Sequence, residues 1–242
     1  MTTARSIRDY RVQIHKQLLA NADTKTKEKV MRLVPGAKVI GVTVPKLRET
    51  VAEFRRAHPD LRLEAATDLM DELCSDRCRE EILFGIFLLG AFGKKTATVS
   101  WDRVSAWSDS LDNWETCDQL ASQVSGAVVA VNLDLVDRLV AFRNSDNRWK
   151  RRFALATASE LNHKGRVHPA EALRVCEVFL ADEEPTVRKA LGWALKEASK
   201  KAAPEVFEFL FTHQQRLPRS VLRDAAEKLT AAQKKQLNIS SA

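Results

Sequence analysis

The chain has 242 residues, and its 39 Lys and Arg against 32 Asp and Glu give a formal net charge of +7 and a pI of about 9.3. This length is enough for a large core in one domain or one continuous array, and the ordinary apolar and charged fractions exclude wholesale disorder. With only eight Gly and seven Pro, an all-β fold is disfavoured and long helices with short links are favoured. The basic excess suggests a polyanionic partner, although a solvated basic surface explains it equally well.

The sequence predicts neither a signal peptide nor a membrane span. The N-terminus has no apolar region of the secretory type, so we expect a cytoplasmic protein. The longest apolar run, residues 82–92, is shorter than the ~20 residues of a membrane-spanning helix and predicts a buried helix. No His lies close to the paired cysteines at 74 and 78 to complete a metal site. Core thiols are therefore predicted for Cys74, Cys78, Cys117 and Cys176.

Helical periodicity runs through almost the whole chain, and no segment predicts a convincing strand. The first helix is predicted over residues 6–22, with Ser6 as its N-cap, and a second over residues 24–34. The only β-branched run, residues 39–45, is short and predicts a loop that leads into a helix with Pro45 in its first turn. Further helices are predicted at residues 46–58, 61–73, 76–91, 100–110, 114–123, 127–142, 147–161, 169–181, 186–200, 204–213 and 218–228.

These elements predict an all-α fold in a single HEAT-like repeat domain over residues 1–242. Its expected parts are an N-terminal helix in residues 1–23, repeats over residues 24–229 and a tail over residues 230–242. The last five residues, "NISSA", are expected to fray.

The second half of the chain repeats itself at the spacing of helical pairs. When Trp114, Trp149, Val187 and Val221 are aligned, successive copies are 35, 38 and 34 residues apart. The stretch "DEEPTVRKALGWAL" resembles a HEAT repeat, although chance similarity among amphipathic helices is the alternative. The repeat predicts a right-handed α-solenoid of HEAT-like helix pairs, with a concave basic face lined by one helix of each pair.

Three aligned positions break this repeat. At the fourth position three copies are apolar, whereas the first copy has Asp118, one helical turn from Trp114. Arg152 occupies a position that takes a small residue in two copies, and Trp193 is the largest residue at its position. Because equivalent helices of a solenoid lie side by side, we expect Asp118, Arg152 and Trp193 to converge.

Two Trp, an Asp and an Arg suit a site for a cationic group near a phosphate. Indole faces attract a cation, a carboxylate stabilises developing positive charge, and arginine binds phosphate through two N–H groups. A buried ion pair between Asp118 and Arg152, flanked by core tryptophans, is the alternative. A positive stripe follows, and it predicts a track for a phosphate backbone, although a solvated helix face explains most of its lysines. Its members are Arg143, Arg148, Lys150, Arg151, Arg152, Lys164, Arg166, Arg174, Arg188, Lys189, Lys196, Lys200 and Lys201.

Four motifs in this order resemble those of the AlkD-like DNA alkylation repair proteins, bacterial HEAT-like DNA glycosylases, and the resemblance covers residues 24–229. They are "GVTVPKLRE", "NWETCDQL", "SDNRWKRRFAL" and "VRKALGWALKE". The resemblance implies excision of cationic N-alkylated purines, of the 3-methyladenine and 7-methylguanine type, from double-stranded DNA in base excision repair. It implies no metal and no organic cofactor, and we expect a monomer in the bacterial cytoplasm.

The resemblance also implies roles for single residues. Trp114, Asp118 and Trp193 match the catalytic residues of the family, and Arg152 matches its phosphate-contacting arginine. Lys196 stands where the family often has Arg. With the positive stripe and the first motif, the predicted DNA-binding residues are Arg152, Arg148, Lys150, Arg151, Lys189, Lys196 and Thr43.

The chain departs from the family pattern at three places. Asn113 stands where relatives often have a second Trp, Glu115 stands where they often have Asp, and residues 41–45 differ from the usual first motif. Two other functions therefore stay open. One is a non-catalytic HEAT-repeat protein that binds distorted or branched DNA, and the other is a protein-binding helical scaffold.

Overall fold

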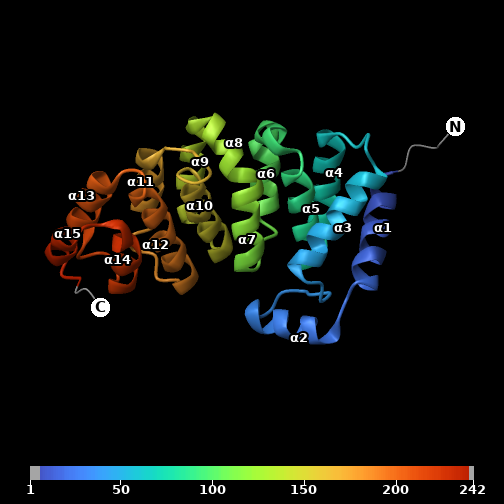
Figure 1. Cartoon of the computed structure of the whole chain (residues 1–242), viewed down its shortest axis with the longest axis horizontal. Helices are drawn as coiled ribbons and strands as arrows, with labels where there is room; N and C mark the ends of the chain where they lie inside the picture. The colour runs from blue at the N-terminus through green and yellow to red at the C-terminus, as the bar shows by residue number, and fades with distance from the viewer. Residues whose placement is uncertain (1–5, 240–242) are drawn as a thin grey trace. The chain divides into compact units, whose positions relative to one another are not determined.

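The computed structural model of the chain describes residues 6–239, which form fifteen α-helices and no β-strand (Figure 1). The predicted all-α fold is confirmed. One isolated parallel bridge, between Lys38 and Cys78, is present in this part of the chain. The chain divides into two compact units, unit 1 up to Val124 and unit 2 from Ser125. Neighbouring repeats of a helical array contact mainly one another, so a division into two units does not by itself test whether the chain is one repeat domain. The single repeat domain and its curvature therefore stay predictions.

Unit 1 is built around one helix that is buried on all sides. This helix, α5, packs against α1, α3, α4 and α7, and its residues from Ile82 to Leu89 are buried, as the apolar run predicts. The helices of unit 1 are α1 (Ile7–Ala20), α2 (Thr24–Leu33), α3 (Val44–Ala57), α4 (Leu63–Cys74), α5 (Arg79–Gly90), α6 (Trp101–Ser108) and α7 (Trp114–Leu120).

The second helix lies at an edge of unit 1, apart from the other helices (Figure 1). Val30 and Val34 of α2 join Ala37 and Val39 in a small buried apolar cluster. The chain then runs without strand or helix to α3, where Thr43 is the N-cap and Pro45 lies in the first turn. The predicted loop over residues 39–45 is thereby confirmed up to the start of α3 at Val44.

The N-terminal helix begins as predicted. The Ser6 hydroxyl accepts the N–H of Asp9, and the Asp9 carboxylate accepts the N–H of Ser6, so the two form a capping box. Ile14 and Leu18 then face the core and are fully buried.

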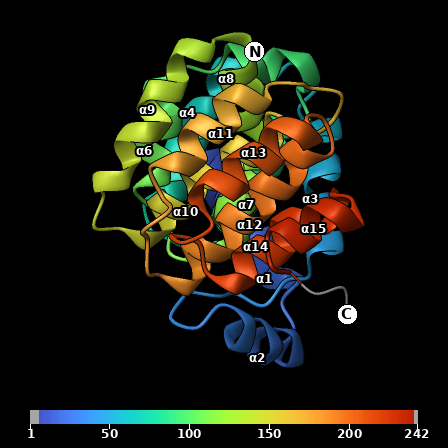
Figure 2. The ribbon, with the colours of Figure 1, turned by 90° about the vertical axis from the view of Figure 1, so that its left-hand side faces the viewer.

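Unit 2 consists of two helical layers. Helix α10 packs on α12 and α12 packs on α14, while α11 contacts both α10 and α12. Figures 1 and 2 show α9, α11 and α13 in one layer and α10, α12 and α14 in the other. The repeat copies that begin at Trp149, Val187 and Val221 lie in this second layer. The helices are α8 (Gly126–Val131), α9 (Val136–Ala141), α10 (Arg148–Glu160), α11 (Pro169–Glu177), α12 (Pro185–Ser199), α13 (Ala203–His213), α14 (Arg219–Ala225) and α15 (Ala231–Gln236).

Several helix boundaries differ from the prediction. The segments predicted as helices over residues 114–123 and 127–142 form α7, a π-helical turn (Ala121–Ser125), α8 and α9. The helix predicted from residue 76 starts only at Arg79, because Arg77 has a positive φ of 50°. Helix α15 was not predicted and lies in the expected tail, where Thr230 and Gln233 form a capping box. The fraying expected for residues 238–242 falls largely on residues 240–242, outside the described part.

All four cysteines are buried, and none of them forms a disulfide among the described residues, as predicted for core thiols. Burial raises the pKa of the Cys74 thiol to about 12 and also raises the pKa of Cys78 and Cys176. Among the described residues, no helix is long and apolar enough to cross a membrane.

Candidate functional site

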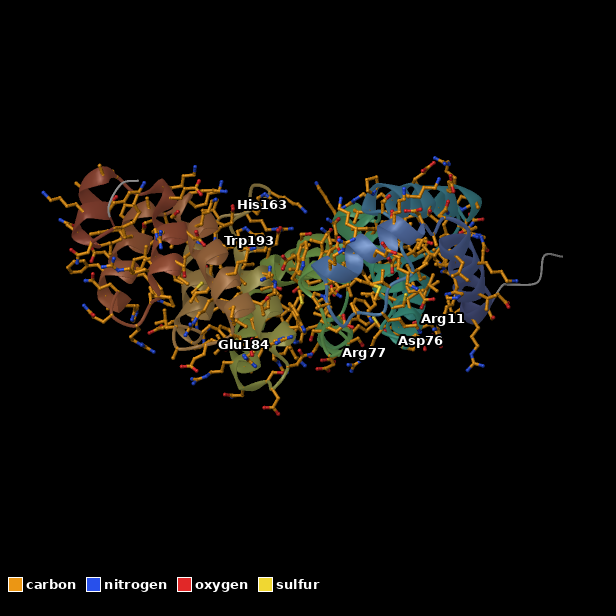
Figure 3. All side chains as sticks on the ribbon, turned by 90° about the horizontal axis from the view of Figure 1, so that it is seen from below. Arg11, Asp76, Arg77, His163, Glu184 and Trp193 are labelled. Atoms are coloured by element: carbon orange, nitrogen blue, oxygen red, sulfur yellow. The ribbon has the colours of Figure 1, made fainter. Side chains whose placement is uncertain are left out.

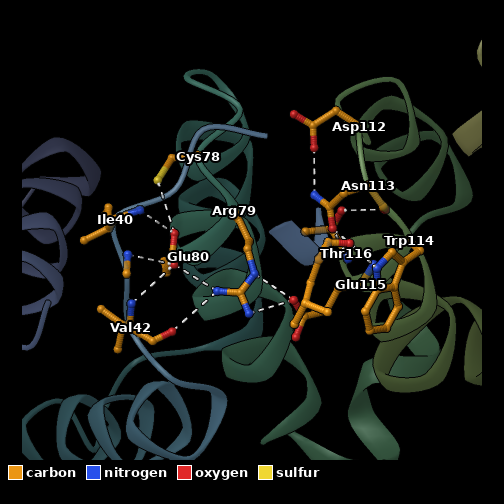
Figure 4. A network of polar contacts seen from close by, with 12 residues as sticks. Ile40, Val42, Cys78, Arg79, Glu80, Asp112, Asn113, Trp114, Glu115 and Thr116 are labelled. Atoms are coloured by element: carbon orange, nitrogen blue, oxygen red, sulfur yellow. Dashed lines mark hydrogen bonds and ion pairs between the residues drawn. The ribbon is translucent and has the colours of Figure 1, made fainter. Parts of the chain in front are cut away.

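Helix α7 begins at a side-chain cap. Asn113 is almost fully buried, and its Oδ1 accepts the N–H groups of Glu115 and Thr116, both at 3.1 Å (Figure 4). Its Nδ2 donates to the Asp112 carboxylate at 2.7 Å. Burial raises the pKa of Asp112, and the bond from Asn113 opposes that rise. Asn113 therefore fixes the start of α7.

Trp114 is exposed and anchored at the same time. It leaves 39% of its surface accessible, while its Nε1–H donates to the carbonyl of Leu33, the last residue of α2, at 3.0 Å. Met31 and Leu33 at the end of α2 are also exposed. An indole held by its N–H offers a π surface of fixed orientation to a ligand.

Asp118 lies one turn after Trp114 on α7 and is partly exposed. Thr116, Cys117 and Leu120 form the buried side of the same helix. Residues four apart project from one side of a helix, so the carboxylate and the indole are neighbours on the accessible side of α7. The aligned residues in the other three copies, Phe153, Leu191 and Ala225, are buried.

A buried charged network lies beside the start of α7 (Figure 4). Glu80 accepts the N–H groups of Ile40 at 2.9 Å, Gly41 at 3.1 Å and Val42 at 3.3 Å. Arg79 donates to Glu80 at 2.9 Å, and two of its nitrogens lie 2.7 and 2.6 Å from the Glu115 carboxylate. The loop before α3 is thereby connected to the first turn of α7.

This network was not predicted, although the sequence contains a signal for it. Arg79, Glu80 and Glu81 open a helix whose next eight residues, 82–89, are apolar or Gly. Charges on a helix that is buried all round are costly unless they are paired, so three in a row predict buried partners.

The predicted residue Thr43 lies at the exposed N-cap of α3, where its hydroxyl accepts the N–H of Lys46 at 3.4 Å. One turn further along α3, Arg48 stacks over the ring of Phe87 at 4.0 Å and donates to Gln119 of α7 at 3.4 Å. The N-terminal half of α3 and helix α7 are thus joined by exposed polar groups within unit 1.

In unit 2, Arg152 is only 5% exposed, and its Nη1 donates to the carbonyl of Thr186 at 2.8 Å and to the Thr186 hydroxyl at 3.2 Å. Arg152 therefore connects α10 to the start of α12. Trp193 lies two turns further along α12 and is partly exposed, and Figure 3 shows it together with Glu184, the residue that caps this helix.

Two predicted DNA-binding arginines are paired with the acidic turn before α12. Arg151 donates to Asp182 at 2.7 Å and to the carbonyl of Ser145 at 2.8 Å. Arg148 lies 3.7 Å from the Glu184 carboxylate and is exposed. Arg151 thus holds the turn before α12 through short hydrogen bonds, whereas Arg148 has only a longer ion pair with that turn.

The three predicted lysines differ in their surroundings. Lys150 lies over the ring of Phe142 at 4.6 Å, and Lys189 is exposed on α12. Lys196 forms an ion pair with Glu227, which raises the pKa of Lys196 and, together with Lys228, lowers the pKa of Glu227 to about 2. Lys196 therefore has a competing anion within its own chain.

The predicted site residues fall into two sets. Trp114, Asp118 and Thr43 belong to unit 1, and Arg152 and Trp193 belong to unit 2 with the remaining cations. The convergence of these two sets stays a prediction. Among residues 6–239, no group of three or more His, Cys, Asp or Glu side chains is arranged to hold a metal ion.

Residues 14–229 match the sequence profile of the family described as "DNA alkylation repair enzyme". A predicted DNA alkylation repair enzyme from Enterococcus faecalis has a similar structure, with a TM-score of 0.70 and 19% identity over 87% of this chain and 98% of that chain. AlkD2 from Streptococcus mutans gives a TM-score of 0.52 and 20% identity over 85% of this chain and 100% of that chain. No curated protein sequence matches significantly. Because the profile spans most of the chain, this protein belongs to the family of DNA alkylation repair enzymes.

Proposed function

We propose that this protein is a DNA glycosylase that releases cationic N-alkylated purines, of the 3-methyladenine and 7-methylguanine type, from double-stranded DNA. The observation that carries the proposal is the pairing of an anchored, exposed indole at Trp114 with the Asp118 carboxylate one turn away. Membership in the DNA alkylation repair family supports alkylated DNA as the substrate of such a pair.

The proposed chemistry needs no general acid. A base alkylated at a ring nitrogen already carries positive charge and is a good leaving group. As the N-glycosidic bond stretches, that charge moves onto the deoxyribose. Asp118 then stabilises the oxocarbenium-like transition state and positions the attacking water, while Trp114 and Trp193 contact the sugar through their π faces. The base leaves as a neutral molecule, water supplies the hydroxyl at the sugar carbon, and the remaining proton of that water passes through Asp118 to solvent.

The proposed DNA contacts use the basic side chains of α10 and α12. Arg152, oriented by Thr186, fixes a phosphate next to the lesion, and an oriented guanidinium loses little entropy when it binds. Lys189 and Arg148 contribute exposed positive charge along the phosphate backbone. Thr43 contributes a further contact from α3.

The test is release of 7-methylguanine from a methylated duplex under single-turnover conditions. We expect Asp118→Asn to lower the rate by about 100-fold or more, since one stabilising group for the transition-state charge is lost, while duplex affinity is retained. Asp112→Asn is the matched control. It changes a carboxylate six residues earlier that bonds to Asn113, and it should keep the wild-type rate.

Three outcomes separate the candidate functions. Release at the wild-type rate by Asp118→Asn contradicts the mechanism. Duplex binding by the wild-type protein without any base release indicates the non-catalytic DNA-binding function. Absence of duplex affinity at physiological salt indicates the protein-binding scaffold.

A further inference from the structure

Three charged side chains form the core of the buried network inside unit 1 (Figure 4). The side chains of Arg79 and Glu80 are 2% and 0% exposed, and the Glu115 side chain is 15% exposed. Buried ion pairs of this kind seldom add stability over apolar residues of the same volume. A role in holding geometry is the more direct explanation for their presence.

At one end of this network, Glu80 holds the loop before α3. Three successive N–H groups, from Ile40, Gly41 and Val42, point at the Glu80 carboxylate. Gly41 reaches this shape at a φ of +108°, where its carbonyl also accepts the N–H of Asp23 at 3.0 Å. A single carboxylate therefore determines where the loop lies before it reaches Thr43.

The other end determines where α7 starts. Arg79 donates its Nε–H to the Glu115 carboxylate at 2.7 Å, and its Nη2 lies 2.6 Å from the same oxygen. The N–H of Glu115 in turn donates to the Asn113 side chain. Because Glu115 directly follows Trp114, a shift of its side chain moves the first turn of the helix that carries Trp114 and Asp118. A guanidinium fork restricts both distance and orientation, which an ammonium group does not.

We propose that Arg79 and Glu115 are positioning residues, which hold the indole and carboxylate of α7 in a fixed place relative to the loop that ends at Thr43. This inference rests on the proposed glycosylase function, because it assigns these residues an effect on base release. A displacement of about 1 Å is enough to slow a reaction about 100-fold, so the network affects the rate without touching the substrate.

Helix α5 offers a matched control for a merely structural role. Glu81 follows Glu80 directly and is equally buried, but it faces α1, where its carboxylate lies 2.7 Å from His15 and 3.6 Å from Arg11. Glu81→Gln removes a carboxylate charge that is more deeply buried than that of Glu115, next to Arg79 and Glu80 on α5, without touching the loop or α7.

The first experiment measures single-turnover base release and undamaged-duplex affinity at a temperature at which all variants are folded. We expect Glu115→Gln to lower the release rate about 10- to 100-fold with nearly unchanged affinity. Glu115→Asp, which restores the charge, should recover part of the rate, and Glu81→Gln should keep it. A wild-type rate in Glu115→Gln, or an equal loss in Glu81→Gln, would overturn the proposal.

The second experiment does not depend on catalysis. In ¹H–¹⁵N spectra, we expect Glu115→Gln to shift both the Trp114 indole signal and the Gly41 amide signal, whereas Glu81→Gln shifts neither. The indole signal is assigned with Trp114→Phe. An unmoved Gly41 signal in Glu115→Gln shows that loop and helix are not coupled and overturns the inference. If the wild-type protein releases no base but both signals move together, the proposed function fails while the coupling stands.

Discussion

Asn113 caps α7 and thereby leaves Trp114, the first residue of this helix, exposed. Its Oδ1 satisfies two N–H groups of the first turn of α7, which have no partner within the helix. Trp114 can then project outward and bond to the carbonyl of Leu33. A Trp at position 113, which the resemblance to AlkD-like proteins implies there, cannot supply this cap. The departure therefore has a structural explanation that does not involve the substrate.

Loss of this cap has a measurable cost. We expect Asn113→Ala to lower the free energy of unfolding by about 1–2 kcal/mol, because two buried N–H groups lose their acceptor. Asn113→Ser keeps a side-chain oxygen at the N-cap and brings no charge next to the Asp112 carboxylate, so it should cost less. Urea unfolding of the three proteins tests this order. Equal stability of wild type and Asn113→Ala would contradict the capping role.

The ion pair between Lys196 and Glu227 predicts a dependence on pH. The pKa of Glu227 is lowered from 4.5 to about 2 by bonds from Lys196 and Lys228. A lowered pKa in the folded state means that the contact contributes stability above pH 4.5 and loses it as the pH falls toward 2. We expect a small difference in Tm between wild type and Glu227→Gln at neutral pH, and we expect this difference to shrink as the pH falls from 4.5 toward 2. A difference that stays constant on acidification would contradict it.

At the scale of elements, the position of α2 depends on one glycine. A Cβ on Gly41 would lie 2.7 Å from the Cβ of Lys27 and 2.8 Å from the carbonyl oxygen of Asp23, and φ is +108°. Gly36 has a φ of +87° but nothing within 4 Å of the added Cβ. Both glycines therefore have a backbone conformation that would strain any L residue, and only at Gly41 would an added Cβ also meet α2.

This difference makes a matched pair of variants. We expect Gly36→Ala to destabilise the protein by about 1 kcal/mol through backbone strain alone. Gly41→Ala should cost clearly more, because α2 must also move away, and it should accelerate proteolysis at α2. Chemical denaturation and limited proteolysis measure the two effects. Equal losses in both variants would show that the contact with α2 carries no weight.

Local pattern explains which elements were predicted from the sequence. The long helices have a strong apolar period, and the loop over residues 39–45 is marked by Gly41 and Pro45. Helix α15 was missed because it is short and polar, with a start defined by the cap at Thr230. The bonds from Arg79 to Glu115 join residues far apart in the chain, and no local period records them. The site residue Asp118 stood out because it breaks a repeat, and Trp114 because it lies one helical turn from Asp118.

At the scale of the whole molecule, the net charge of +7 does not say which surface meets DNA. Each of the two layers of unit 2 has an exposed cation that can be removed separately. Lys189 is exposed on α12, in the layer of α10, α12 and α14. Arg174 is exposed on α11, in the other layer, where it pairs with Asp137 of α9. Each side chain carries one charge, so their removal changes the net charge equally.

The salt dependence of duplex binding distinguishes the two layers. A cation that contacts a phosphate releases about one counterion, so Lys189→Ala should lower the slope of log affinity against log salt by about one. Arg174→Ala should leave the slope unchanged, although Arg174 belongs to the predicted positive stripe and its removal takes away the same charge. The reason is that α11 lies in the other layer from α10 and α12, whose side chains are proposed to contact DNA. Titration of an undamaged duplex at several salt concentrations gives both slopes. A loss for Arg174→Ala and none for Lys189→Ala would place the duplex on the opposite layer, and equal losses would mean that only net charge attracts the duplex.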